Sequence, residues 1–547
     1  MAALDPTIPH IEYDRSKSVQ VSTNYGPIKG FIHTTDTGIK ANVFLGVPYA
    51  KPPVGELRFE HPEPPTPWTE PLETKYPKKP CVPYTKSWLK KTFEDVSEDC
   101  LYLNVIAPVD TDIPHPVLMY IHGGGFCFGD CIRAGFDKYV KNFVSRGIVV
   151  VSITYRVGLY GFFSTGDAVA EGNYGLWDQL AGLKWVHENI AKLGGDPNNV
   201  TLWGQSAGAA SVDALALAPV SRDYVHKVVQ ASGSAFNDFA TAAPNVVSSK
   251  NVAKALGCTS DDSAEIKNFL KKQSTKDIIE AGSNIDISNR DDPNYFWFGP
   301  RIDNAFFGGK SIETLISETP PKPTLFGLMA NEGIGFVVFR ATQEQIKNYK
   351  KEDFLSGVDA MVPKHLVGSE TNALRHELTN FYLKKHGNSP EYFVERHSRL
   401  ISDVMFDAGV LHEMEVKQKQ KWPVYFYIWK HINPKSAKII GTDGACHSYD
   451  LWFTSDQKTF AFDEHGPEEL KIREYYAEML SNFAKTGNPS TEQFEFPAFT
   501  PDQRQALWIL PEPRIDKDGF VGVKKFFDGL EEKYDYSVRR GIRKNEF

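Results

Sequence analysis

A serine between two closely spaced glycines is the first feature of the chain that suggests chemistry. Ser206 is the centre of Gly204-Gln205-Ser206-Ala207-Gly208, which matches the pattern Gly-x-Ser-x-Gly. Such a serine can occupy a sharp turn between a strand and a helix, where small neighbours leave room for its hydroxyl above the sheet. The β-prone residues 200–203 precede the motif, and the helix-forming residues 207–218 follow it. The alternative is a glycine-rich turn that contains a serine by chance. Whether the chain also supplies catalytic partners for Ser206 decides between these two interpretations.

A glycine run upstream of Ser206 could hold a negative charge. His122-Gly123-Gly124-Gly125-Phe126 follows directly after the apolar residues 116–121. Three consecutive glycines can turn backbone N–H groups into a cavity without Cβ clashes. We expect the N–H groups of Gly124, Gly125 and Ala207 to form an oxyanion hole, in which each donor is worth roughly 3–4 kcal/mol of barrier. The alternative is a flexible turn.

A nucleophilic serine also needs a base and an acid that orients the base. The predicted strand 324–330 ends in Asn331-Glu332-Gly333. Catalytic groups gather at the carboxyl ends of parallel strands, and the acid precedes the histidine in this chain order. Glu332 is therefore placed as the acid, while a solvated loop carboxylate remains the alternative.

His447 is the candidate base. It follows the predicted strand 424–428 and a loop of small residues, and the apolar Leu451-Trp452-Phe453 comes soon after it. It would take the Ser206 proton through Nε2 while Glu332 accepts a hydrogen bond from Nδ1–H. Several of the other histidines after Glu332 lie in charged helical stretches typical of a surface; these other histidines are His365, His376, His386, His397, His412, His431 and His465.

The composition limits the classes of protein to which the chain can belong. Its 547 residues are 41% hydrophobic and 24% charged, and the net charge is −8 at pH 7. This modest negative charge argues against a nucleic-acid binder, and no segment approaches the apolar length of a membrane span. No basic region followed by an apolar run opens the sequence, so we expect a cytoplasmic protein, with the secretory pathway as the alternative if the chain does not begin at its native start. The oligomeric state is not indicated.

The six cysteines leave two interpretations open. Cys81 and Cys100 bracket a polar loop and could form a small disulfide, whereas a reducing compartment would keep both thiols free. No pair of cysteines has zinc-finger spacing with histidines beside it. The chemistry expected at Ser206 needs no metal and no cofactor.

Strands and helices alternate through the middle of the chain. This order predicts an α/β fold with a large, mostly parallel central sheet, helices on both faces, and helical insertions that form a cap. We expect one domain over residues 15–535, an N-terminal extension over 1–14, and a short, basic, solvated C-terminal tail over 536–547. The further predicted strands cover 19–23, 28–34, 42–47, 101–107, 148–154 and 227–231, and the main helices cover 176–190, 263–272, 369–386, 389–415 and 468–485.

Other motifs accompany these in a fixed order: FLGVPYA at 44–50, PPVGELRF at 52–59, EDCLYLNV at 98–105, YRVG at 155–158, GNYGLWDQ at 172–179 and GGDPNNVT at 194–201. Together with the glycine run and the Ser206 motif, they resemble the type-B carboxylesterase/cholinesterase family of α/β-hydrolases. The resemblance implies the α/β-hydrolase fold and a triad of Ser206, Glu332 and His447. It also implies the oxyanion hole of Gly124, Gly125 and Ala207, an Arg58–Glu98 ion pair and a Cys81–Cys100 disulfide.

Two departures from the family separate this chain from cholinesterases. Cholinesterases have glutamate before the nucleophile, where this chain has Gln205. Trp88 does not have the offset from Cys100 that the choline-binding tryptophan has from its cysteine. A neutral ester and a general carboxylesterase are therefore favoured. Insect juvenile hormone esterases share the glutamine, so a lipophilic, hormone-like ester is an alternative.

These observations predict a serine carboxylic ester hydrolase of broad specificity. It would convert a small-molecule ester and water into an alcohol and a carboxylate through an acyl-enzyme. The alternatives are a specialised cholinesterase or juvenile-hormone-type esterase, and a slow or non-catalytic adhesion or sequestering protein. Adhesion members of the family have lost the serine, so the presence of all three triad residue types favours an enzyme.

Overall fold

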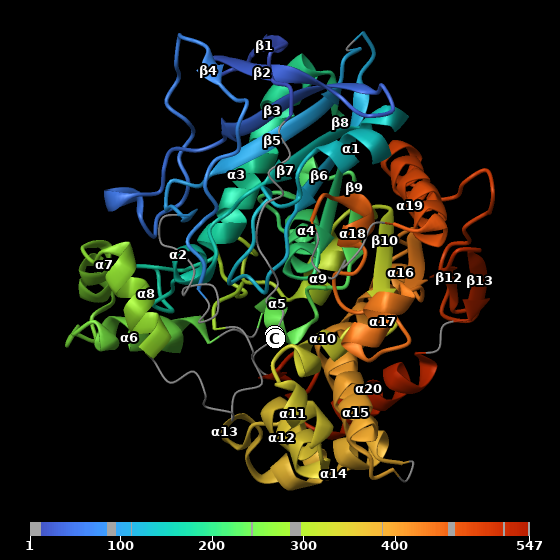
Figure 1. Cartoon of the computed structure of the whole chain (residues 1–547). Helices are drawn as coiled ribbons and strands as arrows, with labels where there is room; N and C mark the ends of the chain where they lie inside the picture. The colour runs from blue at the N-terminus through green and yellow to red at the C-terminus, as the bar shows by residue number, and fades with distance from the viewer. Residues whose placement is uncertain are drawn as a thin grey trace.

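The structure is a computed structural model that describes residues 13–84, 95–110, 112–241, 244–284, 297–384, 387–457, 465–517 and 520–544. One mixed sheet of thirteen strands runs through these residues in the order β1-β2-β3-β5-β7-β6-β8-β9-β10-β11-β12-β13, with β4 beside β2 (Figure 1). This is the mostly parallel central sheet that the sequence predicted. The N-terminal extension lies outside the described residues except for Tyr13 and Asp14, and the predicted domain boundaries stay a prediction.

The N-terminal strands form an antiparallel meander. β1 (Ser18–Ser22), β2 (Pro27–Thr34), β3 (Lys40–Pro48) and β5 (Tyr102–Pro108) pair antiparallel in turn, and β4 (Leu72–Glu73) adds to β2. β5 then pairs antiparallel with β7 (Val149–Ile153), where the direction of the sheet changes. The predicted strands 19–23, 28–34, 42–47 and 101–107 are each present within two residues.

The centre of the sheet is parallel and buried. β7, β6 (His115–Ile121), β8 (Gly195–Gln205), β9 (Lys227–Ala231), β10 (Thr324–Met329), β11 (Val424–Trp429) and β12 (Gln505–Ile509) pair in parallel. Every residue of β7, β9 and β10 is buried, as expected for strands covered on both faces. β13 (Arg514–Lys517) closes the edge antiparallel to β12. Strands β12 and β13 were not predicted from the sequence.

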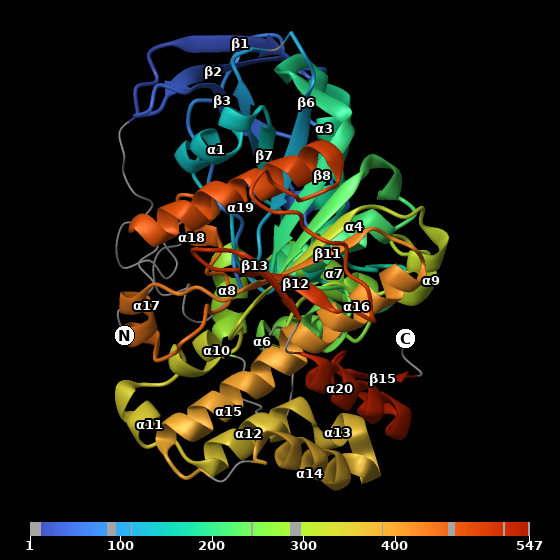
Figure 2. The same cartoon turned by 90° about the vertical axis from the view of Figure 1, so that its right-hand side faces the viewer.

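Helices cover both faces of this sheet (Figures 1 and 2). On one side α3 (Tyr174–Asn189) and α4 (Ala207–Leu217) contact each other and β8. On the other, α1 (Asp137–Asn142), α18 (Leu451–Thr454) and α19 (Pro467–Thr486) contact one another, and α19 reaches β6 and β8. Among the described helices, none is both long enough and apolar enough to cross a membrane.

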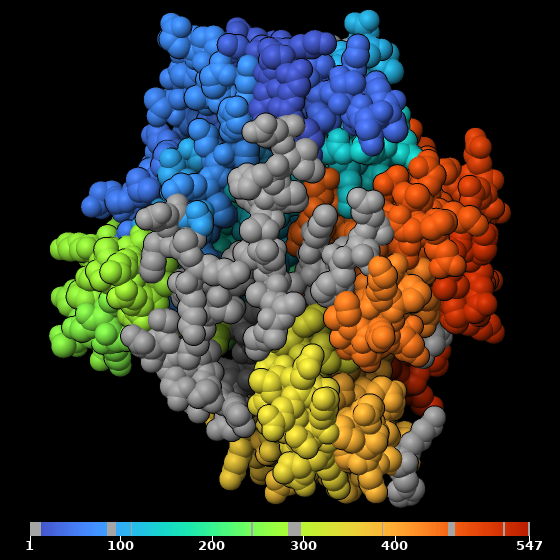
Figure 3. Space-filling model, viewed as in Figure 1, coloured from blue at the N-terminus to red at the C-terminus, as the bar shows by residue number. Residues whose placement is uncertain are grey.

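The inserted helices form two groups beyond the sheet. α6 (Asn245–Ala255), α7 (Ser263–Lys271) and α8 (Thr275–Asn284) make the first group. The second holds α10 (Ile334–Val338), α11 (Gln343–Lys347), α12 (Lys351–Met361), α13 (Lys364–Val367), α14 (Thr371–Tyr382) and α15 (Pro390–Ser402), which form a layer below the sheet in Figure 2. Figure 3 shows the second group (yellow) opposite the N-terminal strands (blue).

One predicted helix is interrupted. Residues 389–415 form α15, a π-helical segment at Asp403–Asp407, and then α16 (Ala408–Lys419). π-helical turns inside α-helices are frequent at functional sites. The spacing of apolar residues in the sequence does not predict the extra residue in this helical turn.

The prediction of a solvated C-terminal tail is wrong. β14 (Tyr536–Ser537) pairs with β15 (Ile542–Arg543), and both Arg539 and Arg540 are buried. Acidic side chains pair with these cations: Glu313 lies 3.4 Å from Arg540, and Asp528 lies 3.3 Å from Arg539. The basic residues therefore attach the end of the chain to α9 (Ile312–Glu318) and α20 (Val521–Lys533).

The two expected links near the N-terminal loops are present. Cys81 and Cys100 form a disulfide with 5.0 Å between their Cα atoms. Arg58 binds both carboxylate oxygens of Glu98, at 2.7 and 2.6 Å. Its Nη1 also donates to the carbonyls of Leu270, Lys271 and Gln273, which end α7. Arg58 thus joins the N-terminal loop to the first helical group. Trp88 lies outside the described residues.

We predict that Arg58→Ala lowers the free energy of unfolding by about 3–5 kcal/mol, because it removes the cationic partner of a nearly buried carboxylate and one donor from each of three carbonyls. Arg58→Lys should recover little of this loss, since an ammonium cannot reproduce the planar fork. The measurement is the midpoint of urea unfolding. In the matched control, Lys29→Ala breaks an exposed pair with Glu73 and should cost less than about 1 kcal/mol. Equal losses in Arg58→Ala and Lys29→Ala would contradict this interpretation.

Candidate active site

Ser206 occupies a strained backbone position between β8 and α4. Its φ of 60° and ψ of −126° lie where residues with a Cβ are rarely found. Backbone hydrogen bonds hold it there: Ser206 N donates to Ala231 O at 2.8 Å, and Ser206 O accepts from Ala209 N at 2.8 Å and from Ala210 N at 3.2 Å. The serine is fixed by the neighbouring strand β9 and by the first turn of α4.

The glycines around Ser206 are required by close backbone contacts. A Cβ on Gly204 would lie 2.0 Å from the carbonyl oxygen of Gly208, and one on Gly208 would lie 2.1 Å from that of Ile121. Gly233, after β9, is a third such residue, because its Cβ would lie 2.4 Å from Ser206 O. Gly233 was not predicted from the sequence, although Ser232-Gly233-Ser234 directly follows the buried strand β9.

The glycine loop after β6 lies beside the serine. A Cβ on Gly123 would lie 2.9 Å from the Cβ of Ser206. Gly124 and Gly125 have φ of 116° and 59°, in the left-handed region that favours glycine. The Gly124 carbonyl accepts from the N–H groups of Cys127 and Phe128, which fixes the loop as a turn. Ala207, the third expected donor, is the first residue of α4 and is fully buried.

His122, at the start of this loop, is held in its neutral form. Its ring stacks on Tyr155 with 4.3 Å between centroids, and its Nδ1 lies 2.8 Å from Gly123 O. Burial lowers the pKa of His122 to about 4. The ring therefore adds no positive charge next to the glycine loop at neutral pH.

Glu332 and His447 come together although they are 115 residues apart. Nδ1 of His447 lies 2.7 Å from Oε2 of Glu332, and the other carboxylate oxygen accepts from Met329 N at 2.8 Å. Glu332 is completely buried, so it is not the solvated loop carboxylate that was its alternative. Asn331 N donates to Ala445 O at 2.9 Å, which joins the two loops directly.

Other described histidines have different partners. His431 lies 2.8 Å from Glu469 on α19, and His397 lies 2.6 Å from the Tyr349 hydroxyl, with its pKa lowered to about 4 by burial. His412 packs on Phe236 with 4.8 Å between ring centroids. Of the candidates in the sequence, His386 lies outside the described residues.

Helix α15 supports the loop that carries Glu332. Gly333 N donates to Ser402 Oγ at 2.8 Å, and Ser398 Oγ donates to Asn331 Oδ1 at 2.6 Å. Ser398 and Ser402 both lie near the end of α15, directly before the π-helical segment. Phe406, which lies within that segment, packs against His447 with 4.4 Å between ring centroids. Sequence spacing gave no indication of this contact.

Aromatic rings flank His447. Phe336 lies 5.6 Å from His447 and 5.7 Å from Phe406, and Phe239 lies 5.8 Å from Phe406, measured between ring centroids. These side chains come from α10, from the π-helical segment and from the region after β9. Aromatic rings thus supply an apolar contact to one side of the histidine.

A buried ion cluster holds the helix that follows Ser206. Asp213 on α4 lies 2.7 Å from Nζ of Lys417 on α16, and Glu413 lies 2.6 Å from the same nitrogen. All three side chains are fully buried. Burial and the charge of Asp213 raise the pKa of Glu413 to about 8. The cluster fixes α4 against α16, and so fixes the turn at Ser206.

A second buried acid lies three residues after His447. Asp450 is fully buried. Burial, with a smaller effect from the Glu332 charge, raises the pKa of Asp450 to about 7. The sequence analysis did not identify this residue, because a carboxylate after a loop histidine has no distinctive pattern.

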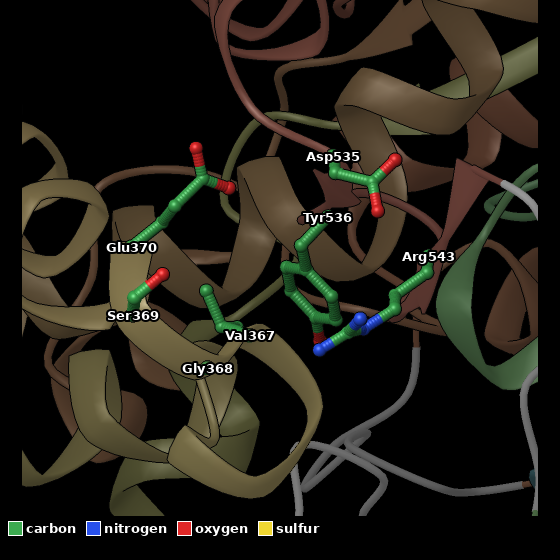
Figure 4. Close-up of a pocket in the computed structure, with 7 residues that line it drawn as sticks. All are labelled: Val367, Gly368, Ser369, Glu370, Asp535, Tyr536 and Arg543. Atoms are coloured by element: carbon green, nitrogen blue, oxygen red, sulfur yellow. The ribbon is translucent and has the colours of Figure 1, made fainter.

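Two cavities lie away from these residues. One, of about 260 Å³, lies between the 367–370 turn and the C-terminal hairpin, and includes Asp535, Tyr536 and Arg543 (Figure 4). The other, of about 680 Å³, lies beside Glu98 and Thr275. Neither is lined by Ser206, Glu332 or His447, so neither belongs to the candidate active site.

Comparison with known proteins identifies the family of the chain. The model of the carboxylesterase family matches residues 17–525. The chain belongs to the carboxylesterase family. Gut esterase 1 of Caenorhabditis elegans is 35% identical, over 95% of this chain and 94% of that protein, and gut esterase 1 of Caenorhabditis briggsae is 34% identical over the same shares. The mouse pyrethroid hydrolase Ces2a is 30% identical, over 93% of this chain and 90% of that protein.

The family defines the activity in general terms. This carboxylesterase is a serine ester hydrolase of broad specificity with the α/β-hydrolase fold. The relatives named above are esterases and hydrolases rather than cholinesterases, in agreement with the presence of Gln205 before the serine.

We predict that Asp450→Asn changes how stability depends on pH. The unfolded carboxyl has a pKa near 4, and the folded one is raised to about 7. The stability that the neutral acid contributes is thus complete below pH ~4 and is lost as pH rises through ~7. The asparagine stays neutral throughout. From pH 5 to pH 8 the variant should gain about 2–3 kcal/mol relative to the wild type.

The measurement is the free energy of unfolding of both proteins at pH 5 and pH 8. The matched control is Asp502→Asn at an exposed position, which should show no such pH-dependent difference. A constant difference between Asp450→Asn and the wild type at the two pH values would mean that Asp450 does not titrate in this range.

Proposed function

We propose that Ser206, His447 and Glu332 are the nucleophile, base and orienting acid of this esterase, with the N–H groups of Gly124, Gly125 and Ala207 as the oxyanion hole. The observation that carries the proposal is the 2.7 Å contact between His447 Nδ1 and Glu332. It occurs at the carboxyl ends of strands that also present a strained serine and a glycine loop.

Acylation begins with the histidine. An ionised Glu332 can only accept, so Nδ1 of His447 carries the proton and Nε2 carries the lone pair of the ring. Nε2 takes the proton of Ser206 as Oγ attacks the ester carbonyl carbon. The carbonyl oxygen becomes an oxyanion that the three N–H groups stabilise. The tetrahedral intermediate collapses, the C–O bond to the alcohol breaks, and the imidazolium gives its proton to the departing oxygen.

Deacylation repeats these steps with water. His447 takes a proton from the water, whose oxygen attacks the acyl carbon, and the same N–H groups hold the second oxyanion. The bond to Ser206 Oγ breaks, and Oγ recovers its proton from His447. The products are one alcohol and one carboxylic acid, which is ionised at neutral pH.

The surroundings of His447 support neutral, apolar esters as the preferred substrates. Phe406, Phe336 and Phe239 supply apolar contact, and Gln205 is uncharged. A cationic alcohol such as choline would gain no ionic partner from this position. The net charge of −8 supports a small-molecule substrate rather than a nucleic acid.

We predict that Ser206→Ala reduces turnover of p-nitrophenyl esters by about 10⁴-fold or more while leaving the fold intact. The wild type should show a burst of p-nitrophenol equivalent to one acyl group per chain, and the variant should show none. The measurement is stopped-flow absorbance over a series of acyl-chain lengths, with acetylthiocholine as the cationic comparison. Ser317→Ala, on the exposed side of α9, is the matched control and should keep wild-type rates.

Two outcomes would contradict the proposal. Hydrolysis that survives Ser206→Ala would mean that another residue is the nucleophile. A strong preference for acetylthiocholine over neutral esters of the same acyl group would contradict the proposed substrate class, even if Ser206 is the nucleophile.

A further inference from the structure

Gln205 contacts the proposed base. It is the last residue of β8 and is only 2% exposed. Its side-chain nitrogen Nε2 lies 3.3 Å from Nε2 of His447. A Cβ built on Gly123 would lie 3.0 Å from Gln205 Oε1. The amide therefore lies between the glycine loop and the histidine, on the ring nitrogen opposite to Glu332.

The amide suits both protonation states of that nitrogen. In the neutral ring, Nδ1–H donates to Glu332, so Nε2 is an acceptor and the amide N–H can donate to it. In the imidazolium, Nε2–H is a donor that needs an oxygen. The terminal torsion of glutamine is broad and roughly two-fold, so a half-turn presents Oε1 in place of the NH₂ group. A glutamate carboxylate at this position could only accept a hydrogen bond. A methionine thioether cannot donate a hydrogen bond and accepts one only weakly.

We propose that Gln205 is a positioning residue: its amide holds Nε2 of His447 in both protonation states without adding charge to the site. This inference rests on the proposed triad. Gln205 directly precedes the nucleophile Ser206 in the chain. The amide and the Ser206 hydroxyl share Nε2, so the amide orients the ring before and after each proton transfer and not during it.

The charged groups near His447 come from several elements. Glu332 follows β10, and Asp450 lies on the same loop as the histidine. Asp407, in the π-helical segment, is close enough to Glu332 for their charges to interact, and it binds Arg399 of α15. The buried thiol of Cys446 precedes the histidine. Gln205 is the side chain that the carboxyl end of β8 places against the ring, so a substitution there changes the charge at Nε2 and leaves these groups in place.

Two variants separate positioning from charge. Gln205→Met keeps the volume and neutrality but loses the amide, and we expect kcat to fall about three- to tenfold with little change in KM, as for one lost hydrogen bond. Gln205→Glu adds a carboxylate that favours the imidazolium, so the acid limb of the kcat/KM profile should move to higher pH by about one unit. Gln179→Met, which removes a buried amide bonded to Ser211 at 3.0 Å, is the matched control and should change neither quantity.

The measurement is kcat and KM for one p-nitrophenyl ester from pH 5 to 9, with thermal unfolding to confirm that each variant folds. The proposal is overturned if Gln205→Met keeps kcat within twofold, or if the acid limb of Gln205→Glu stays in place. Failure of the triad itself is distinguished by His447→Gln. If that variant keeps wild-type turnover, the base is misassigned, whereas an inactive His447→Gln with unaffected Gln205 variants refutes only the role of Gln205.

Discussion

The close backbone packing at Ser206 is the constraint on which the site depends. A residue with a Cβ at φ 60° and ψ −126° costs of the order of 1–3 kcal/mol, and it persists only when its surroundings hold it in place. Here the carbonyl of Ala231 and the N–H of Ala209 hold the backbone. Gly204 and Gly208 leave room for carbonyl oxygens within about 2 Å of where a Cβ would be. The strain is the consequence of projecting a serine above a buried sheet, and the sheet and α4 offset it.

The parallel sheet brings the other groups to that serine. β6 ends at the glycine loop, β8 ends at Gln205 and Ser206, and β10 ends just before Glu332. The loop that carries His447 pairs with the Glu332 loop through Asn331 and Ala445. Because neighbouring parallel strands end at the same edge, residues more than a hundred positions apart meet without a long connection. Helix α15 supports the acid loop through Ser398 and Ser402, and the ion cluster around Lys417 fixes α4.

Local patterns predicted the central strands, the turn at Ser206 and the glycine loop. Glycines beside a buried apolar run indicate a turn after a strand, and this inference needs no knowledge of residues distant in sequence. Glu332 could be placed only by its position after a strand, and its burial depends on the His447 loop. The π-helical segment, Asp450 and the buried Arg540 could not be predicted, because each depends on neighbours distant in sequence. The short strand β12 lies next to the edge strand β13, and its sequence shows no clear alternation of apolar and polar residues. The cytoplasmic location stays a prediction.

The measurement that tests the central claim most directly is the site of covalent labelling by an organophosphate, located by peptide mass spectrometry. If Ser206 is activated by His447 and Glu332, the wild type should take up one phosphyl group per chain on Ser206 and lose activity in proportion. A His447→Gln variant should label far more slowly. Stoichiometric labelling at another residue, or equally fast labelling of Ser206 without the histidine, would contradict the account.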